Sequence, residues 1–158
     1  MKMKTMVILT LLLMLTSTVS LASNSLFVHG IVDGHEAEVI LDDRGGNGGA
    51  FDALVYVDAR GTLLHGSPQG IMYRKVSVVG DGSDLRAFFD AGKIYITNAV
   101  YLPGECHACS RNTSAQEFGF EHGKLTSEGV VTVADPPLLT VNATEKLRQS
   151  IVRAFATR

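Results

Sequence analysis

Apolar residues alternate with polar ones in a series of short segments, and turns containing glycine separate these segments. The first two segments, Phe27 to Val32 and Glu36 to Asp42, flank Asp33-Gly34. An Asp-Gly pair between two such segments is the strongest short signal for a β-hairpin. The chain therefore begins its folded part with a predicted pair of antiparallel strands.

The second segment also indicates the kind of sheet. Ala37, Val39 and Leu41 fall on one face of the predicted strand, and Glu36, Glu38 and Asp42 fall on the other. One apolar and one polar face is typical of an antiparallel sheet that packs on a core and meets water on its other side. Similar patterns predict further strands at Phe51 to Asp58, Thr62 to His65, Ile71 to Val79, Lys93 to Tyr101, Gln116 to Glu121 and Val130 to Ala134, with Leu138 to Val141 as an optional last one.

Two segments have helical spacing instead. Asp84 to Ala91 carries Leu85, Phe88 and Phe89 on one side, with Ser83 or Asp84 as a possible N-cap and Gly92 at the end. This pattern predicts a short internal helix.

The C-terminal segment predicts a longer amphipathic helix. Asn142 and Glu145 have the spacing of a capping box. Leu147, Ile151, Val152 and Phe155 form an apolar stripe opposite Lys146, Arg148, Gln149 and Arg153. We expect this helix to pack on the core, since basic residues toward a C-terminus also complement the helix dipole. The whole pattern predicts an α+β domain, mainly an antiparallel sheet of about seven or eight short strands with one internal and one C-terminal helix.

The first 22 residues have the composition of a secretory signal peptide. Lys2 and Lys4 precede an uncharged apolar run from Met6 to Leu15, and small residues lead up to Ala22. The run is too short to be a membrane anchor. We expect cleavage after Ala22, no stable membrane insertion afterwards, and a single exported domain over residues 23–158, periplasmic in the first instance or fully secreted.

Charge argues against one class of partner. Without Lys2 and Lys4 the chain keeps 12 of its 14 basic residues and all 16 acidic ones, a formal net charge of −4. This balance lacks the basic surface that binds phosphate backbones, so we do not expect nucleic acid as a partner.

The two cysteines, Cys106 and Cys109, stand in the segment Cys-His-Ala-Cys and allow three interpretations. Export places them in an oxidising compartment, which favours a disulfide that stiffens a turn. A redox pair is the second interpretation, with His107 stabilising a thiolate, although no helical pattern follows the motif. The third is a metal site, which would need ligands such as His107 and His122 to complete the two cysteines.

The remaining candidate residues indicate no particular chemistry. The pairs Glu36 with Glu38 and Glu117 with Glu121 fit the solvated faces of strands, and His29, His35 and His65 fit the rim of a sheet. No motif for a serine hydrolase, a zinc protease or a nucleotide site occurs in the sequence.

Size, export and the lack of catalytic motifs favour a non-enzymatic protein with no cofactor. It would bind a protein or a small ligand, as inhibitors, immunity proteins and accessory factors do. A thiol redox or metal-handling protein that uses Cys106 and Cys109 is the alternative, and a hydrolase whose site is assembled in space is a third hypothesis.

Overall fold

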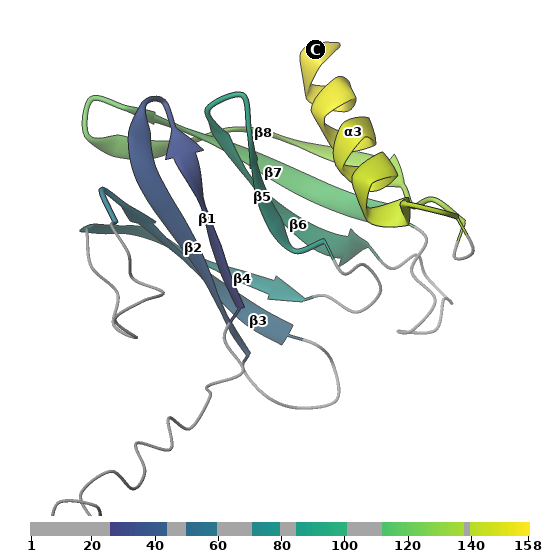
Figure 1. Ribbon diagram of the computed structural model, residues 1–158, viewed down its shortest axis with the longest axis horizontal. Coiled ribbons are helices and arrows are strands. Elements are labelled where there is room, and N and C mark those ends of the chain that lie inside the picture. Colours follow the sequence, from purple (N-terminus) through teal and green to yellow (C-terminus); the bar gives the residue numbers. More distant parts are fainter. Residues whose placement is uncertain (1–25, 44–49, 60–70, 80–84, 101–111, 138–139) are drawn as a thin grey trace, which may run out of the picture.

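The computed structural model describes residues 26–43, 50–59, 71–79, 85–100, 112–137 and 140–158, with β4 described by its backbone alone. The described part contains eight strands and one helix (Figure 1). The strands are β1 (Leu26–Val32), β2 (His35–Asp43), β3 (Ala50–Val57), β4 (Ile71–Val79), β5 (Ala87–Asp90), β6 (Lys93–Val100), β7 (Asn112–Glu121) and β8 (Lys124–Ala134), and the helix is α3 (Ala143–Ala156). The predicted α+β class, mainly antiparallel β, is confirmed.

The strands form two four-stranded antiparallel sheets, and each is a meander in chain order. Sheet A has the order β1-β2-β3-β4, and sheet B has the order β5-β6-β7-β8. The hairpin predicted at Asp33-Gly34 is confirmed, because β1 and β2 pair from Leu26 with Leu41 to Val32 with His35. Both turn residues have positive φ angles, 44° and 85°, as a type I′ turn requires.

The two sheets pack face to face around the main core. Sheet A contributes mostly valine and alanine side chains, and sheet B contributes Ile94, Ile96, Phe118 and Phe120. At one point β1 approaches β5 so closely that Phe89 lies over Gly30, where a Cβ atom would overlap the ring. Glycine at this position is therefore required by packing.

Sheet B is buried on its second face as well, because α3 packs there (Figure 1). Leu147 and Ile151 of the helix are buried against Leu85, Phe88, Tyr95 and Ala115. Val152 and Phe155 pack at the edge of the same cluster, so the predicted apolar stripe is confirmed. The described elements thus form three layers: sheet A, sheet B and α3.

The internal helix predicted over 84–91 is wrong. Ala87–Asp90 is strand β5, which pairs with Lys93 to Ile96 of β6 through a tight turn at Ala91-Gly92. Phe88 and Phe89 therefore point to opposite faces of sheet B. Because both faces are covered, both rings find apolar partners.

Asn142 is the N-cap residue of α3, as predicted, but the predicted capping box is wrong. Asn142 has a left-handed conformation, with φ 57°, and its side chain makes no capping hydrogen bond. Glu145 accepts hydrogen bonds from Arg148 and Gln149. Residues 140–141 are not in a strand, whereas the strand expected at Thr62 to His65 lies outside the described residues.

Candidate functional site

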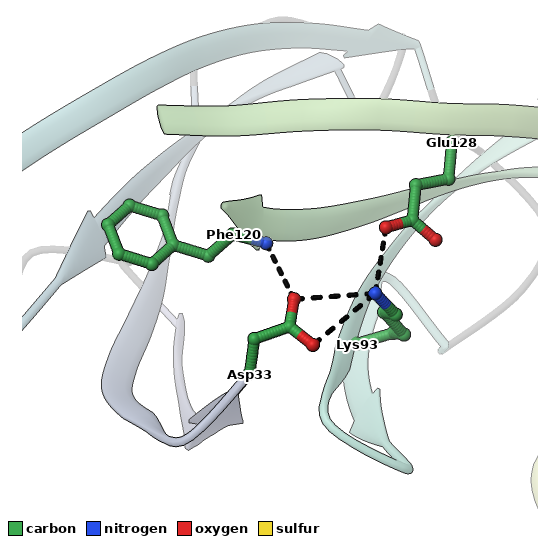
Figure 2. Close-up of polar contacts among 4 residues, drawn as sticks. All are labelled: Asp33, Lys93, Phe120 and Glu128. Carbon is green, nitrogen blue, oxygen red and sulfur yellow. Dashed lines mark hydrogen bonds and ion pairs between the residues drawn. The ribbon is translucent and has the colours of Figure 1, made fainter. Parts of the chain in front are cut away.

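One charged cluster joins three hairpins at one end of the sandwich (Figure 2). Asp33, in the β1–β2 turn, accepts a hydrogen bond from the backbone N–H of Phe120 at 2.7 Å. Lys93 Nζ lies 3.3 Å from Asp33 Oδ2 and 2.7 Å from Glu128 Oε1. The backbone N–H of Asp33 also donates to the carbonyl oxygen of Gly92 at 2.8 Å. The cluster therefore ties sheet A to three strands of sheet B.

The pKa shifts of this cluster agree with its geometry. The Phe120 N–H and the charge of Lys93 lower the pKa of Asp33, although partial burial opposes them. The hydrogen bond to Glu128, followed by that to Asp33, raises the pKa of Lys93. Each charged form is thus stabilised by its neighbours.

This cluster is a structural clamp. All three of its charged groups are paired, and they fill the space beside Gly119, where a Cβ atom would overlap Glu128 and crowd Lys93. A cluster in which every charged group has a partner holds the two sheets together.

The second candidate lies on the face of sheet A that points away from sheet B, which we call the outer face. Its described side chains are Phe27, His29 and Ile31 of β1, Glu36, Glu38, Ile40 and Asp42 of β2, and Asp52, Leu54 and Tyr56 of β3. They stand in cross-strand rows, one of which is His29, Glu38 and Tyr56. Four of these described side chains are carboxylates, and the register of β4 places Lys75 on the same face, opposite Leu54.

Glu38 is the exceptional member of this face. It is 0% exposed, and neither carboxylate oxygen has a hydrogen-bond partner. Taking a carboxylate out of water without a partner costs several kcal/mol. Such a cost points to a position kept for a purpose other than stability.

Glu38 therefore corrects the prediction that Glu36 and Glu38 both lie on a solvated face. Glu36 is exposed, as expected, but Glu38, Ile40 and Asp52 are buried on the outer face. The alternating pattern predicts which face a residue occupies, and it does not predict how much of that face is covered. The sequence thus indicated the position of Glu38 and missed its burial.

The other predicted carboxylates and histidines have ordinary surroundings. Glu121 is exposed and Glu117 is partly exposed. His29 is exposed on the outer face. His35 is exposed near the clamp, where Nδ1 lies 3.1 Å from Asp58 Oδ1 and the ring meets Phe120 edge to face.

Cys106, His107 and Cys109 lie outside the described residues, so the disulfide, the redox pair and the metal site stay predictions. His65 lies outside them too. The described residues on either side of the cysteine segment are neighbours, because Val100 of β6 pairs with Asn112 of β7.

His122 lies too far along the chain to join such a metal site. It follows the last residue of β7, whereas the cysteine segment precedes the first. The ten residues of β7 span about 30 Å. The three-residue step from Cys109 to Asn112 reaches at most about 11 Å back. The reach of the chain therefore keeps His122 out of bonding distance of Cys109.

The described residues include neither a cluster of metal ligands nor a helix that could span a membrane. They contain no group of three or more histidine, cysteine, aspartate or glutamate side chains placed to hold a metal ion. The same residues include no helix with the length and apolar composition needed to cross a membrane.

Comparison with known proteins adds no assignment, since no family model, no curated protein and no solved structure matches this chain. A function for the outer face of sheet A therefore has to be inferred from the side chains that form it.

Proposed function

We propose that this chain is a small exported, non-enzymatic binding protein that holds a protein or small-ligand partner on the outer face of sheet A. One observation carries the proposal: Glu38 is fully buried there with both carboxylate oxygens unpaired. A partner that displaces the side chains over Glu38 would supply the interactions that these oxygens lack.

The rest of the outer face supports this assignment. Among the described elements, α3 packs on sheet B and no helix packs on the outer face of sheet A, where Glu38, Ile40 and Asp52 are nevertheless buried. The face combines carboxylates with partly exposed apolar and aromatic side chains, Phe27, Leu54 and Tyr56. A mixture of aromatic anchors and charged groups is typical of surfaces that recognise partners.

A site-specific photocrosslink tests the proposal. A photoreactive amino acid replaces Ile31, which is 56% exposed on the outer face, and in a second variant it replaces Val130, which is 49% exposed on β8. Both variants are irradiated in the exported fraction of the native source and the products are separated by mass. We expect a discrete crosslinked species from position 31 and none from position 130.

The partner from position 31 is then purified, and its Kd for the unmodified protein is measured by calorimetry. Saturable one-site binding supports the proposal. Equal crosslinking at both positions, or none at position 31, would contradict it.

A further inference from the structure

β8 is the last strand of sheet B, so one of its edges has no paired strand among the described residues. The N–H and C=O of one residue in an antiparallel strand point the same way, and successive residues point in opposite directions. The N–H of Thr97 points toward β5, since it donates to the carbonyl oxygen of Arg86. Ile96 therefore faces β7, and the register through Gln116 leaves the N–H and C=O of Val130 facing away from β7.

The part of β8 that follows Gly129 is suited to pairing with another strand. By the same alternation Thr132 and Ala134 also turn their backbone groups away from β7, and the side chains of Val130, Thr132 and Ala134 are exposed. The segment Val-Val-Thr-Val-Ala has high β-propensity and contains neither a charge nor a proline. We call this segment, Val130 to Ala134, the open edge of β8. Strand edges of this kind pair readily with other chains unless a feature of the protein blocks them.

The first part of β8 carries the usual protection of an edge strand. Lys124 and Glu128 are charged, and the register with β7 skips Glu128, where a β-bulge interrupts the ladder. Charges and bulges both discourage the addition of a further strand. The open edge has neither feature, so its protection must come from elsewhere.

Arg158, which follows α3, lies on the open edge. Its Nη2 donates to the carbonyl oxygen of Val130 at 2.6 Å. The guanidinium fills the space beside Gly129, where a Cβ atom would overlap Nη1, and it lies over the Phe155 ring with Cζ 5.6 Å from the ring centroid. Gly129 has φ 148°, a conformation that favours glycine. Arg158 thus occupies a carbonyl oxygen that an added strand would need.

The open edge is complementary to itself. In an antiparallel pair of two copies centred on Thr132, that residue faces its own copy, Val131 faces Val133, and Val130 faces Ala134. Thr–Thr pairs and pairs of β-branched side chains across strands are favourable, and no like charges meet within the segment. The N–H of Ala134 would donate to the carbonyl oxygen of Val130 in the other copy. A second copy of this chain therefore fits the open edge.

We propose that the open edge of β8 is a self-association site, and that Arg158 closes it by occupying the carbonyl oxygen of Val130. The wild-type chain therefore stays monomeric at this edge, whereas loss of the Arg158 side chain lets two copies join their B sheets through β8. The site lies on sheet B, so the inference does not depend on the function proposed for the outer face of sheet A. Because Arg158 closes the edge, position 130 remains a valid control for the crosslink.

Size-exclusion chromatography with light scattering tests the inference. The wild type, Arg158→Ala, Arg153→Ala and the double variant Arg158→Ala with Thr132→Pro are compared at matched concentrations up to about 0.5 mM. Arg153→Ala is the matched control, because it removes an exposed arginine from α3 itself. Thr132→Pro removes an N–H that points away from β7, so it blocks the open edge without breaking the ladder of sheet B.

We expect Arg158→Ala to associate roughly tenfold or more tightly than the wild type, because neither copy has to give up the Arg158 hydrogen bond. Its mean mass should approach twice that of the monomer. The amides of Thr132 and Ala134 should exchange more slowly with solvent in this dimer. Arg153→Ala should associate within about twofold of the wild type. Adding Thr132→Pro should return Arg158→Ala to the monomer.

Three results would overturn the inference, once circular dichroism has shown that Arg158→Ala is folded. Arg158→Ala could remain as monomeric as the wild type, which would mean that Arg158 closes nothing. A dimer whose Thr132 and Ala134 amides stay unprotected, or that persists with Thr132→Pro, would use another surface. A complex with a chain of a different mass would show that the partner is not a second copy. The exchange measurement needs only Arg158→Ala, so it does not depend on the folding of the proline variant.

Discussion

Asp33 and Glu38 are carboxylates five residues apart, yet their surroundings differ completely. Asp33 is partly exposed, accepts a backbone hydrogen bond and faces Lys93. Glu38 is fully buried and has no hydrogen-bond partner. The first is placed to stabilise the fold, whereas the second lowers its stability.

This difference predicts that removing the charge of Glu38 stabilises the protein. Glu38→Met keeps a similar volume and removes a buried carboxyl group that has no hydrogen-bond partner, so we expect the free energy of unfolding to rise by about 1–4 kcal/mol. Urea denaturation followed by circular dichroism measures it. The exposed control Glu36→Gln should change stability by less than about 0.5 kcal/mol. A loss of stability in Glu38→Met would show that the carboxylate has a stabilising role.

A second prediction concerns Gly30, where Phe89 leaves no room for a Cβ atom. Gly30→Ala should lower the free energy of unfolding by about 1–3 kcal/mol, because overpacking pushes the two sheets apart. The double variant Gly30→Ala with Phe89→Ala should lose less than the sum of the single losses. Additive losses in a denaturation cycle would argue against this contact.

For single residues, the sequence predicted the face of the strand on which each side chain lies, but not how deeply that side chain is buried. The period of two correctly put Ala37 and Val39 in the core and Glu38 on the opposite face. The burial of Glu38 depends on residues that are far away in the sequence. No local pattern contains that information, which is why the candidate site emerged only from the structure.

The clamp is a property of whole elements, since it joins the β1–β2 turn to β6, β7 and β8 (Figure 2). The pKa of Asp33 is lowered below 3.8 in the folded protein. Its contribution to stability is therefore fully present above that ordinary value and is lost as the pH falls through the lower, folded pKa. The clamp should be intact at neutral pH and fail only in strong acid.

Asp33→Asn should therefore lower the free energy of unfolding at pH 7 by about 1–3 kcal/mol, because it weakens charge-assisted hydrogen bonds. The variant should also lose less stability than the wild type between about pH 5 and pH 2. Urea titrations at several pH values measure both effects, with Glu121→Gln as the control. Parallel pH profiles for Asp33→Asn and the wild type would contradict the assignment.

The packing of α3 gives a further prediction. Ile151 lies on the buried side of α3 and is 0% exposed. Ile151→Ala should therefore lower the free energy of unfolding by about 2–5 kcal/mol. Lys146→Ala, on the exposed side of the helix, should cost less than about 0.5 kcal/mol. Thermal denaturation of both variants makes the comparison, and equal losses would mean that α3 does not rest on this contact.

The incorrectly predicted internal helix has a clear physical cause. Leu85, Phe88 and Phe89 have helical spacing, but two adjacent apolar residues also suit a strand that is buried on both faces. Sheet B is buried on both faces only because the third layer, α3, covers its second face. The Asp33-Gly34 hairpin was predictable because its turn signal is entirely local, whereas β5 depends on a helix more than fifty residues away.

At the scale of the whole molecule, the sequence predicted which kinds of elements the fold contains, but it did not predict how they are arranged in layers. Antiparallel pairing and the C-terminal helix follow from local periods, whereas strand β5 does not. The division into two sheets, and the choice of sheet B as the middle layer, follow from contacts such as β1 with β5 and β4 with β6. These contacts join distant segments, so no single stretch encodes them.

The proposed export gives a prediction for the whole chain. Protein purified from the exported fraction without reductant should begin at Ser23, and the predicted disulfide between Cys106 and Cys109 should make its mass two hydrogens lower than that of the reduced chain. Cys106→Ser with Cys109→Ser should cost about 2 kcal/mol at most. Intact mass, thiol counting and metal analysis test this, and free thiols with bound zinc would favour the metal-handling alternative.

The order of the strands has one more consequence. Every strand of sheet A precedes every strand of sheet B, and each sheet is a meander of sequential neighbours. A cut in the chain between β4 and β5 would break no pairing within either sheet. Each fragment would keep its own hydrogen-bond ladder and expose one apolar face that only the other fragment can cover. Two separately produced halves should therefore recognise each other and reassemble, which would make this chain a candidate for a split-protein reporter.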